Sequence, residues 1–163
     1  MSYPEPRYVG DTGEASASYR PNGREHELTY PSSGVTVDYL AVGASTDGEF
    51  GLYRWNFGPN ETGPGPHFHR TISESFYILS GTVRLYDGQQ WVETGPGDYL
   101  YVPPGGIHGF KNVTGEPASM LILFTPGAPR EEYFETLAAL NRGKEFSDQE
   151  RAEFFLRHDN HIV

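Results

Sequence analysis

Four residues of this chain have side chains that can bind one metal ion together: His67, His69, Glu74 and His108. His67 and His69 are two positions apart, and in an extended strand the side chains at i and i+2 point to the same face. Glu74 opens an apolar run that is typical of a strand. His108 follows the sharp turn expected at Pro103-Pro104-Gly105-Gly106. A local pair and two distant ligands predict a site shared between neighbouring strands of a sheet.

The types of these side chains indicate which metal ions would bind. Three neutral imidazoles and one carboxylate suit Fe(II), Ni(II), Co(II), Mn(II) or Zn(II), whereas calcium and magnesium prefer more oxygen ligands. We therefore expect one divalent transition metal ion per chain. Four protein ligands leave an ion that prefers five or six with open positions, as in catalytic sites. One carboxylate against a dication also leaves a formal charge of +1, which could hold an enolate, a phenolate or a carboxylate.

The elements that must position these residues are mostly strands. Aromatic residues make up 14% of the 163 residues, with 20 glycines and 13 prolines, which favours short strands, tight turns and an all-β class. Period-2 alternation and apolar runs predict strands near residues 35–42, 50–57, 74–80, 82–86, 90–93, 99–102, 107–112 and 118–124. After Pro126 the apolar spacing becomes helical. It predicts one helix from about Pro129 that stops at Gly143, and a second that opens with a capping box at Ser147-Asp-Gln-Glu150.

Two patterns that contain the four residues resemble the motifs of the cupin superfamily. The first is His67-x-His69-x4-Glu74-x6-Gly81, and the second is Gly97-x5-Pro103-x-Gly105-x2-His108-x3-Asn112. The family motif begins with a glycine six residues before the first histidine. This chain has Glu61 there, and we interpret the nearby Gly63 and Gly65 as a shifted turn. The resemblance covers about residues 34 to 125 and implies a jelly-roll barrel in which the three histidines and the glutamate are metal ligands.

The sequence predicts one domain that consists of three segments. A chain of this length fits one domain with a sizeable core. We expect residues 1–33 to be an irregular N-terminal arm, residues 34–126 to be the cupin β-barrel, and residues 127–163 to be a C-terminal helical extension of the same domain.

Parity along the strands predicts which side chains line a substrate pocket. If Glu74 points inward, its neighbours two and four positions along do so too, and the same holds for His108 and the residue two positions after it. The aromatic candidates on other strands could share this surface, although each candidate also fits an ordinary sandwich core. The predicted pocket is apolar and aromatic and suits a flat organic molecule. Its residues would be Trp55, Phe57, Phe76, Ile78, Tyr99, Tyr101 and Phe110.

Within the superfamily, the sequences around the first motif, at Leu121–Pro126 and in the helical tail are similar to those of microbial quercetin 2,3-dioxygenase-like proteins. This resemblance implies a metal-dependent cleavage of a flavonol ring by dioxygen. It also implies that Glu74 assists deprotonation of the substrate while remaining a ligand. Two other classes stay open because one ligand set serves many reactions. One is a metal-dependent isomerase or polyketide cyclase that does not use dioxygen, and the other is a non-catalytic cupin that binds metal and ligand.

Composition excludes several other classes. A formal net charge of -10 argues against nucleic-acid binding, and the lack of cysteine excludes disulfides and thiolate metal sites. No apolar run is long enough for a membrane span, and the N-terminus lacks the apolar core of a signal peptide, so we expect a cytoplasmic protein.

An arm beside an otherwise open sheet edge also favours a homodimer.

Overall fold

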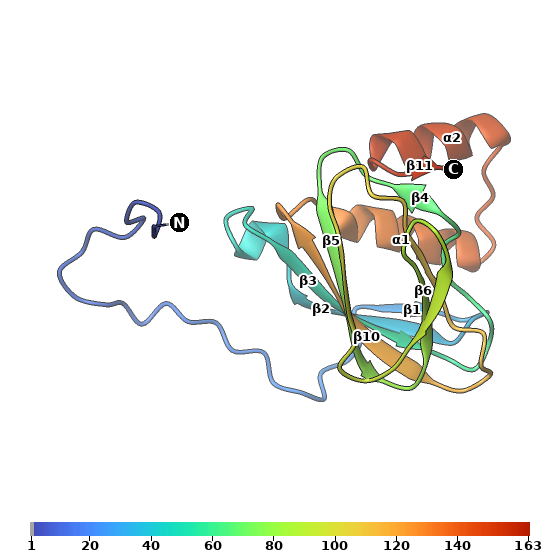
Figure 1. The fold of residues 1–163 in the computed structure, drawn as a ribbon, viewed down its shortest axis with the longest axis horizontal. Coiled ribbons are helices and arrows are strands. Elements are labelled where there is room, and N and C mark those ends of the chain that lie inside the picture. Colours follow the sequence, from blue (N-terminus) through green and yellow to red (C-terminus); the bar gives the residue numbers. More distant parts are fainter. Residues whose placement is uncertain (1) are drawn as a thin grey trace.

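The structure, a computed structural model, describes residues 2–163 and consists mainly of antiparallel sheets (Figure 1). The largest sheet has six strands in the order β1-β2-β3-β10-β5-β8. Their bounds are β1 Leu28–Tyr30, β2 Val35–Ala41, β3 Gly51–Phe57, β10 Ala118–Thr125, β5 Ser73–Ser80 and β8 Tyr99–Val102. A three-stranded sheet has the order β7-β6-β9, with β7 Trp91–Thr94, β6 Val83–Tyr86 and β9 Gly109–Lys111. A short pair joins β4, His67–Phe68, to β11, His161–Ile162, and a 3-10 turn covers Gly43–Ser45.

The hydrophobic core lies between the sheets, and strand alternation builds it. In β3 and β10 every second residue is buried, as period-2 patterning predicts. Tyr53, Phe76, Ile78, Met120 and Ile122 are almost completely buried in this core. The all-β class expected from the composition is confirmed, and the architecture is a rolled β sandwich with two short helices.

The two helices are α1, Arg130–Asn141, and α2, Asp148–Arg157, and Figure 1 shows them at one end of the sandwich. The hydroxyl of Tyr30 in β1 donates to the carbonyl oxygen of Phe134 at 2.8 Å, which ties α1 to the sheet. The capping box at Ser147 and Glu150 is present at the start of α2. Gly143, with φ 100°, follows the end of α1, so both helix boundaries expected from the sequence are confirmed.

Two short strands depart from the sequence expectation. Residues 2–27 contain no helix or strand, and most of them run outside the sandwich (Figure 1), but β1 lies inside the range 1–33 that we expected to be irregular. Strand β11 was also not expected, because two residues at a chain end carry no readable period. It pairs with β4, so His161 lies opposite Phe68 and Ile162 opposite His67. The C-terminal segment is thereby joined to the strand that carries His67. The boundaries of the three segments remain a prediction.

In residues 2–163, the structure contains no helix that is both long and apolar enough to cross a membrane.

Candidate metal centre

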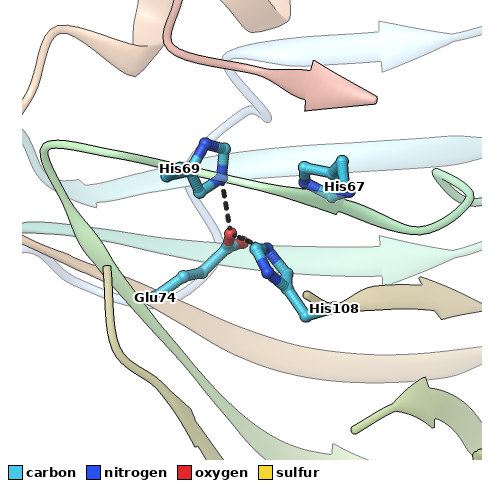
Figure 2. A group of neighbouring side chains, drawn as sticks. All are labelled: His67, His69, Glu74 and His108. Atoms are coloured by element: carbon cyan, nitrogen blue, oxygen red, sulfur yellow. Dashed lines mark hydrogen bonds and ion pairs between the residues drawn. The ribbon is translucent and has the colours of Figure 1, made fainter. Parts of the chain in front are cut away.

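Backbone pairing brings the four predicted metal ligands together (Figure 2). His67 and His108 lie opposite each other in an antiparallel bridge, with N···O distances of 2.9 and 2.8 Å. The backbone N–H of Gly105 donates to the carbonyl oxygen of His69 at 2.6 Å, so the turn before His108 is fixed against the first histidine pair. Glu74 reaches the same place from β5. All four side chains are buried.

The ligand atoms nearly have the spacing that a metal ion requires. One ligand atom from each of the four side chains lies within 4.8 Å of all the others. Two donor atoms that each lie about 2.1 Å from one ion can be at most about 4.2 Å apart. A pair 4.8 Å apart would therefore have to close by at least about 0.6 Å, which side-chain rotations can supply.

Hydrogen bonds at the far side of each ring fix the histidine tautomers. Nδ1 of His67 lies 2.9 Å from the carbonyl oxygen of Gly65, and Nδ1 of His108 lies 2.9 Å from that of Gly106. Nδ1 of His69 lies 2.6 Å from the carbonyl oxygen of Asp159. A carbonyl oxygen can only accept, so each Nδ1 must carry the proton. In the neutral ring Nε2 then has a free lone pair, and this arrangement is the usual one for a histidine that binds a metal ion.

The contacts of Glu74 require either a proton or a metal ion between the facing atoms. Its Oε2 lies 3.1 Å from Nε2 of His69 and 2.8 Å from Nε2 of His108 (Figure 2). If both rings were neutral with the proton on Nδ1, these contacts would bring lone pairs together. A proton on Nε2 or a metal ion between the atoms removes that repulsion. The donor set and its geometry therefore fit one divalent transition metal ion.

The electrostatics of the cluster keep His67 neutral and Glu74 ionised, and these are the protonation states that a metal ion requires of them. Burial lowers the pKa of His67 to about 4, so this ring is neutral at neutral pH. Burial alone would raise the pKa of Glu74, but the charge and hydrogen bonds of His108 and the hydrogen bond of His69 outweigh it and hold the pKa well below its usual range. Burial alone would lower the pKa of His108, but the carboxylate of Glu74 outweighs burial and raises it. Glu74 is thus an ionised, buried carboxylate.

The C-terminal tail positions His69, which the sequence analysis did not anticipate. Besides accepting from His69 through its carbonyl, Asp159 uses its carboxylate to accept from the backbone N–H groups of Arg70 and Thr71, at 3.0 and 2.8 Å. The hydroxyl of Thr71 also donates to this carboxylate at 2.7 Å. Asp159 lies about 90 residues from its partners, so no local sequence pattern could have revealed the contact. The only sequence signal was a polar Asp-Asn pair after an amphipathic helix.

The turn before the first motif lies later in the chain than the family motif places it, as expected from Glu61. Gly63 has φ 141°, and a Cβ on it would lie 1.9 Å from the carbonyl oxygen of Phe110. Only glycine fits such a close approach of two backbones. The requirement for glycine therefore lies two residues after Glu61, beside the isolated bridge between Thr62 and Asn112.

A cavity of about 350 Å³ adjoins the candidate metal centre. His67 and Glu74 form part of its wall, and the rest is mainly aromatic. Of the pocket residues predicted from the sequence, Trp55 and Phe110 line this cavity. The other side chains that surround it include Tyr30, Phe124, Arg130, Tyr133, Phe134, Leu137, Phe155, Asn160 and Ile162. The C-terminal helices and tail thus form much of the wall.

The other predicted pocket residues do not line the cavity. Phe57, Phe76 and Ile78 are buried in the core behind it. The expectation for Tyr99 and Tyr101 was wrong, because these side chains are 61% and 55% exposed.

The strand register explains the exposure of the two tyrosines. Strand β8 pairs with β5 so that Val102 lies opposite Glu74 and Leu100 opposite Phe76. Directly opposed residues in an antiparallel pair share a face. The inward positions of β8 are therefore the even-numbered ones, and Tyr99 and Tyr101 lie on the outer face.

Comparison with known proteins identifies the architecture. Residues 53–124 match the family model of the cupin domain. These residues form a cupin domain. The structure of KdgF from a Halomonas species superposes with a TM-score of 0.60 at 19% identity, covering 71% of this chain and 98% of that one. An RmlC-like cupin from Shewanella frigidimarina superposes with a TM-score of 0.55 at 19% identity, covering 72% and 96% of the two chains. At such identities these likenesses show the fold alone.

Two curated relatives are similar at the level of sequence. Quercetin 2,3-dioxygenase of Bacillus subtilis (strain 168) is 29% identical over 118 residues, which cover 72% of this chain and 34% of that protein. A probable germin-like protein, subfamily 2 member 5, of Arabidopsis thaliana is 34% identical over 106 residues, which cover 60% of this chain and 46% of that protein. The matched region thus spans about a third to a half of the length of these relatives.

Proposed function

We propose that this cupin domain binds one divalent transition metal ion through His67, His69, Glu74 and His108 and acts as a dioxygenase on a flat, enolisable aromatic molecule of the flavonol type. The observation that carries the proposal is the position of the cluster, since His67 and Glu74 form part of the wall of an aromatic cavity. A buried structural site would have no such opening. The similarity to a quercetin 2,3-dioxygenase supports the choice of reaction.

The cavity has the size and lining expected for such a ligand. Its volume of about 350 Å³ falls within the range of about 300–1,000 Å³ that is typical of small-molecule sites. Trp55, Phe110 and Phe124 offer ring faces and edges, with Trp55 and Phe110 in an edge-on contact at 5.8 Å between centroids. Aromatic walls of this kind favour a planar ring over a sugar phosphate.

In this proposal Glu74 is the base for the first proton transfer. A bound divalent ion would act as a Lewis acid that stabilises a negatively charged oxygen on the substrate. Glu74 is ionised, and the hydrogen bonds that it makes with residues 2–163 all involve Oε2, so Oε1 is the oxygen free to take a proton. Transfer of the enol proton of the substrate to Oε1 would leave the enolate bound and Glu74 neutral. The aromatic walls would exclude water while the electron-rich enolate reacts with dioxygen.

Elemental analysis combined with oxygen uptake tests this proposal. The purified chain should contain about one transition metal ion, and it should consume oxygen when quercetin or a related flavonol is added. Glu74→Gln removes the proposed base with little change in shape, so oxygen uptake should fall by at least about 100-fold. Tyr101→Phe, on the outer face, is the control and should retain activity. Turnover of an enolisable substrate without oxygen would instead indicate a Lewis-acid isomerase or cyclase, and bound metal without any turnover would indicate a binding protein.

A further inference from the structure

One buried positive charge in the cavity is not explained by the proposed metal site. Arg130, the first residue of α1, is only 4% exposed and forms part of the cavity wall. Across residues 2–163, no carboxylate lies within ion-pair distance of its guanidinium. Isolated buried charges are costly, and proteins normally pair them. A charged group kept in this position indicates that its partner comes from outside the chain.

The hydrogen bonds of Arg130 leave donor capacity free. Its Nη1 donates to the carbonyl oxygen of His158 at 2.7 Å, and its Nη2 donates to Oδ1 of Asn160 at 3.2 Å. The guanidinium also lies 4.3 Å from the ring centroid of Tyr133 and 5.1 Å from that of Phe124. These contacts hold the group in place, but the buried Nε–H has no acceptor within the chain described here.

Tyr133 adds a second unused donor beside the guanidinium. Its hydroxyl oxygen accepts a hydrogen bond from Nδ2 of Asn160 at 2.8 Å. The hydroxyl proton therefore remains available for another acceptor. Burial raises the pKa of Tyr133 to about 12, so the group keeps this proton at neutral pH. Asn160 thus fixes both the guanidinium and the phenol and leaves donors on each.

The net charge of the cavity is a further argument for a partner of Arg130 from outside the chain. Its wall contains two ionised side chains, Glu74 and Arg130. With a dication bound, the formal sum is +2 - 1 + 1, or +2. Asp159 is another acid that acts on Arg130, but its carboxylate accepts from Arg70 and Thr71. A cavity with excess positive charge favours an anionic ligand.

We propose that Arg130 and Tyr133 bind an anionic oxygen of the cavity ligand, and that the ligand is an aromatic acid whose carboxylate or phenolate oxygen occupies this position. The anion position is separate from the ligand quartet. The further statement that the substrate carries two acidic oxygens, one for the metal end and one for Arg130, rests on the proposed function.

The test compares charged and neutral ligands of the same shape on the full chain. Benzoate and benzamide are one pair, and 4-nitrophenolate and 4-nitroaniline are a second pair that separates phenolate from carboxylate. Binding is measured by calorimetry first on chain dialysed against a chelator, because without metal only the protein can attract the anion. One anion of the two pairs should bind about tenfold to a hundredfold more tightly than its neutral partner. Equal binding of both members in both pairs would overturn the proposal.

Substitutions assign the preference to Arg130. Arg130→Met keeps the length of the side chain and removes its charge, so the anion should bind no more tightly than its neutral partner. Arg130→Lys should retain part of the preference for the anion. Arg84→Met is the matched control, because Nε of Arg84 is also buried without an acceptor but Arg84 does not line the cavity. It should leave the preference unchanged. An undiminished preference in Arg130→Met would refute the assignment.

A measurement on the unaltered chain covers the case in which Arg130→Met does not fold. The Nε–H of a buried arginine gives its own resonance in nitrogen-proton correlation spectra. The Arg130 signal should shift with the preferred anion and not with its neutral partner, and an unmoved signal would refute direct contact. Repeating the titration with Zn²⁺ bound separates the two proposals. Loss of metal binding would leave the anion result standing, and loss of anion binding would leave the metal centre standing.

Discussion

The contact between the C-terminal tail and His69 gives a quantitative prediction for Asp159→Ala. The substitution removes the acceptor of four donors, namely the N–H groups of Arg70 and Thr71, the hydroxyl of Thr71 and Nε2 of His161. Each such bond contributes roughly 0.5–1.5 kcal/mol, and the low end applies because Arg70 and Thr71 are exposed and water can replace the acceptor. The lost bonds therefore amount to about 2 kcal/mol.

Backbone conformation adds to this cost. Asp159 has φ 55°, which aspartate tolerates better than alanine, and the difference is about 1 kcal/mol. The sum of about 3 kcal/mol should lower Tm by about 6–12 °C in a chain of this length. Because the same tail carbonyl holds Nδ1 of His69, we also expect the metal Kd to rise by about 10- to 100-fold.

Two variants separate the causes. Asp47 also has positive φ, 51°, but lies in the turn after the 3-10 segment. Asp47→Ala should cost about 1 kcal/mol of stability and leave metal affinity unchanged. Asp159→Asn keeps one acceptor oxygen and tolerates this backbone, so it should recover much of both losses. Stability is read from thermal melts, and affinity from competition with a chromophoric chelator. Wild-type affinity in a destabilised Asp159→Ala would refute the positioning role of the tail.

Three further predictions follow from the structure. His69→Ala or His108→Ala should reduce the bound metal from about one ion per chain to almost none. The β circular-dichroism spectrum should stay largely intact, because the hydrophobic core does not depend on the ion. Full metal occupancy in either variant would contradict the ligand assignment. The second concerns buried Asp38: burial alone would raise its pKa, but hydrogen bonds from His26, Arg54 and Asn56 outweigh burial and hold the pKa below its usual value. Its stabilisation is therefore present above the unfolded pKa of about 3.9 and is lost as pH falls through the folded pKa. Below about pH 4, the urea midpoint of Asp38→Asn should consequently fall less steeply with pH than that of the wild type. Parallel curves of urea midpoint against pH would contradict this. Finally, we predict a homodimer at micromolar concentration, and a monomeric mass in light scattering would exclude it.

Much of the β fold could be predicted because long strands carry a readable period. The predicted strands at 50–57 and 118–124 differ from β3 and β10 by only one residue at an end. The strands that were missed, β1 and β11, have three and two residues. So few residues contain no full repeat, and only their partner strands determine that they pair.

The ligand quartet was predictable, whereas the face of β8 was not. His67 and His69 share a face by local geometry, and the two motif patterns fix the distant ligands. Tyr99 and Tyr101 were placed inward for their aromatic character, but the register against β5 decides which face of β8 is buried. A shift of one residue reverses every side chain in a strand, so composition cannot replace register.

The sequence and the structure thus inform different parts of the candidate site. The quartet lies within two recognisable motifs, and the proposed chemistry depends on it. The features that would select a ligand, Arg130, Tyr133 and Asn160, belong to the C-terminal extension and meet the motif residues only through tertiary contacts. Since one ligand quartet serves many reactions, substrate choice must come from residues outside the motifs. In this chain the cavity wall contributed by the extension carries a positive charge, and that charge is the physical basis for expecting an acidic aromatic ligand.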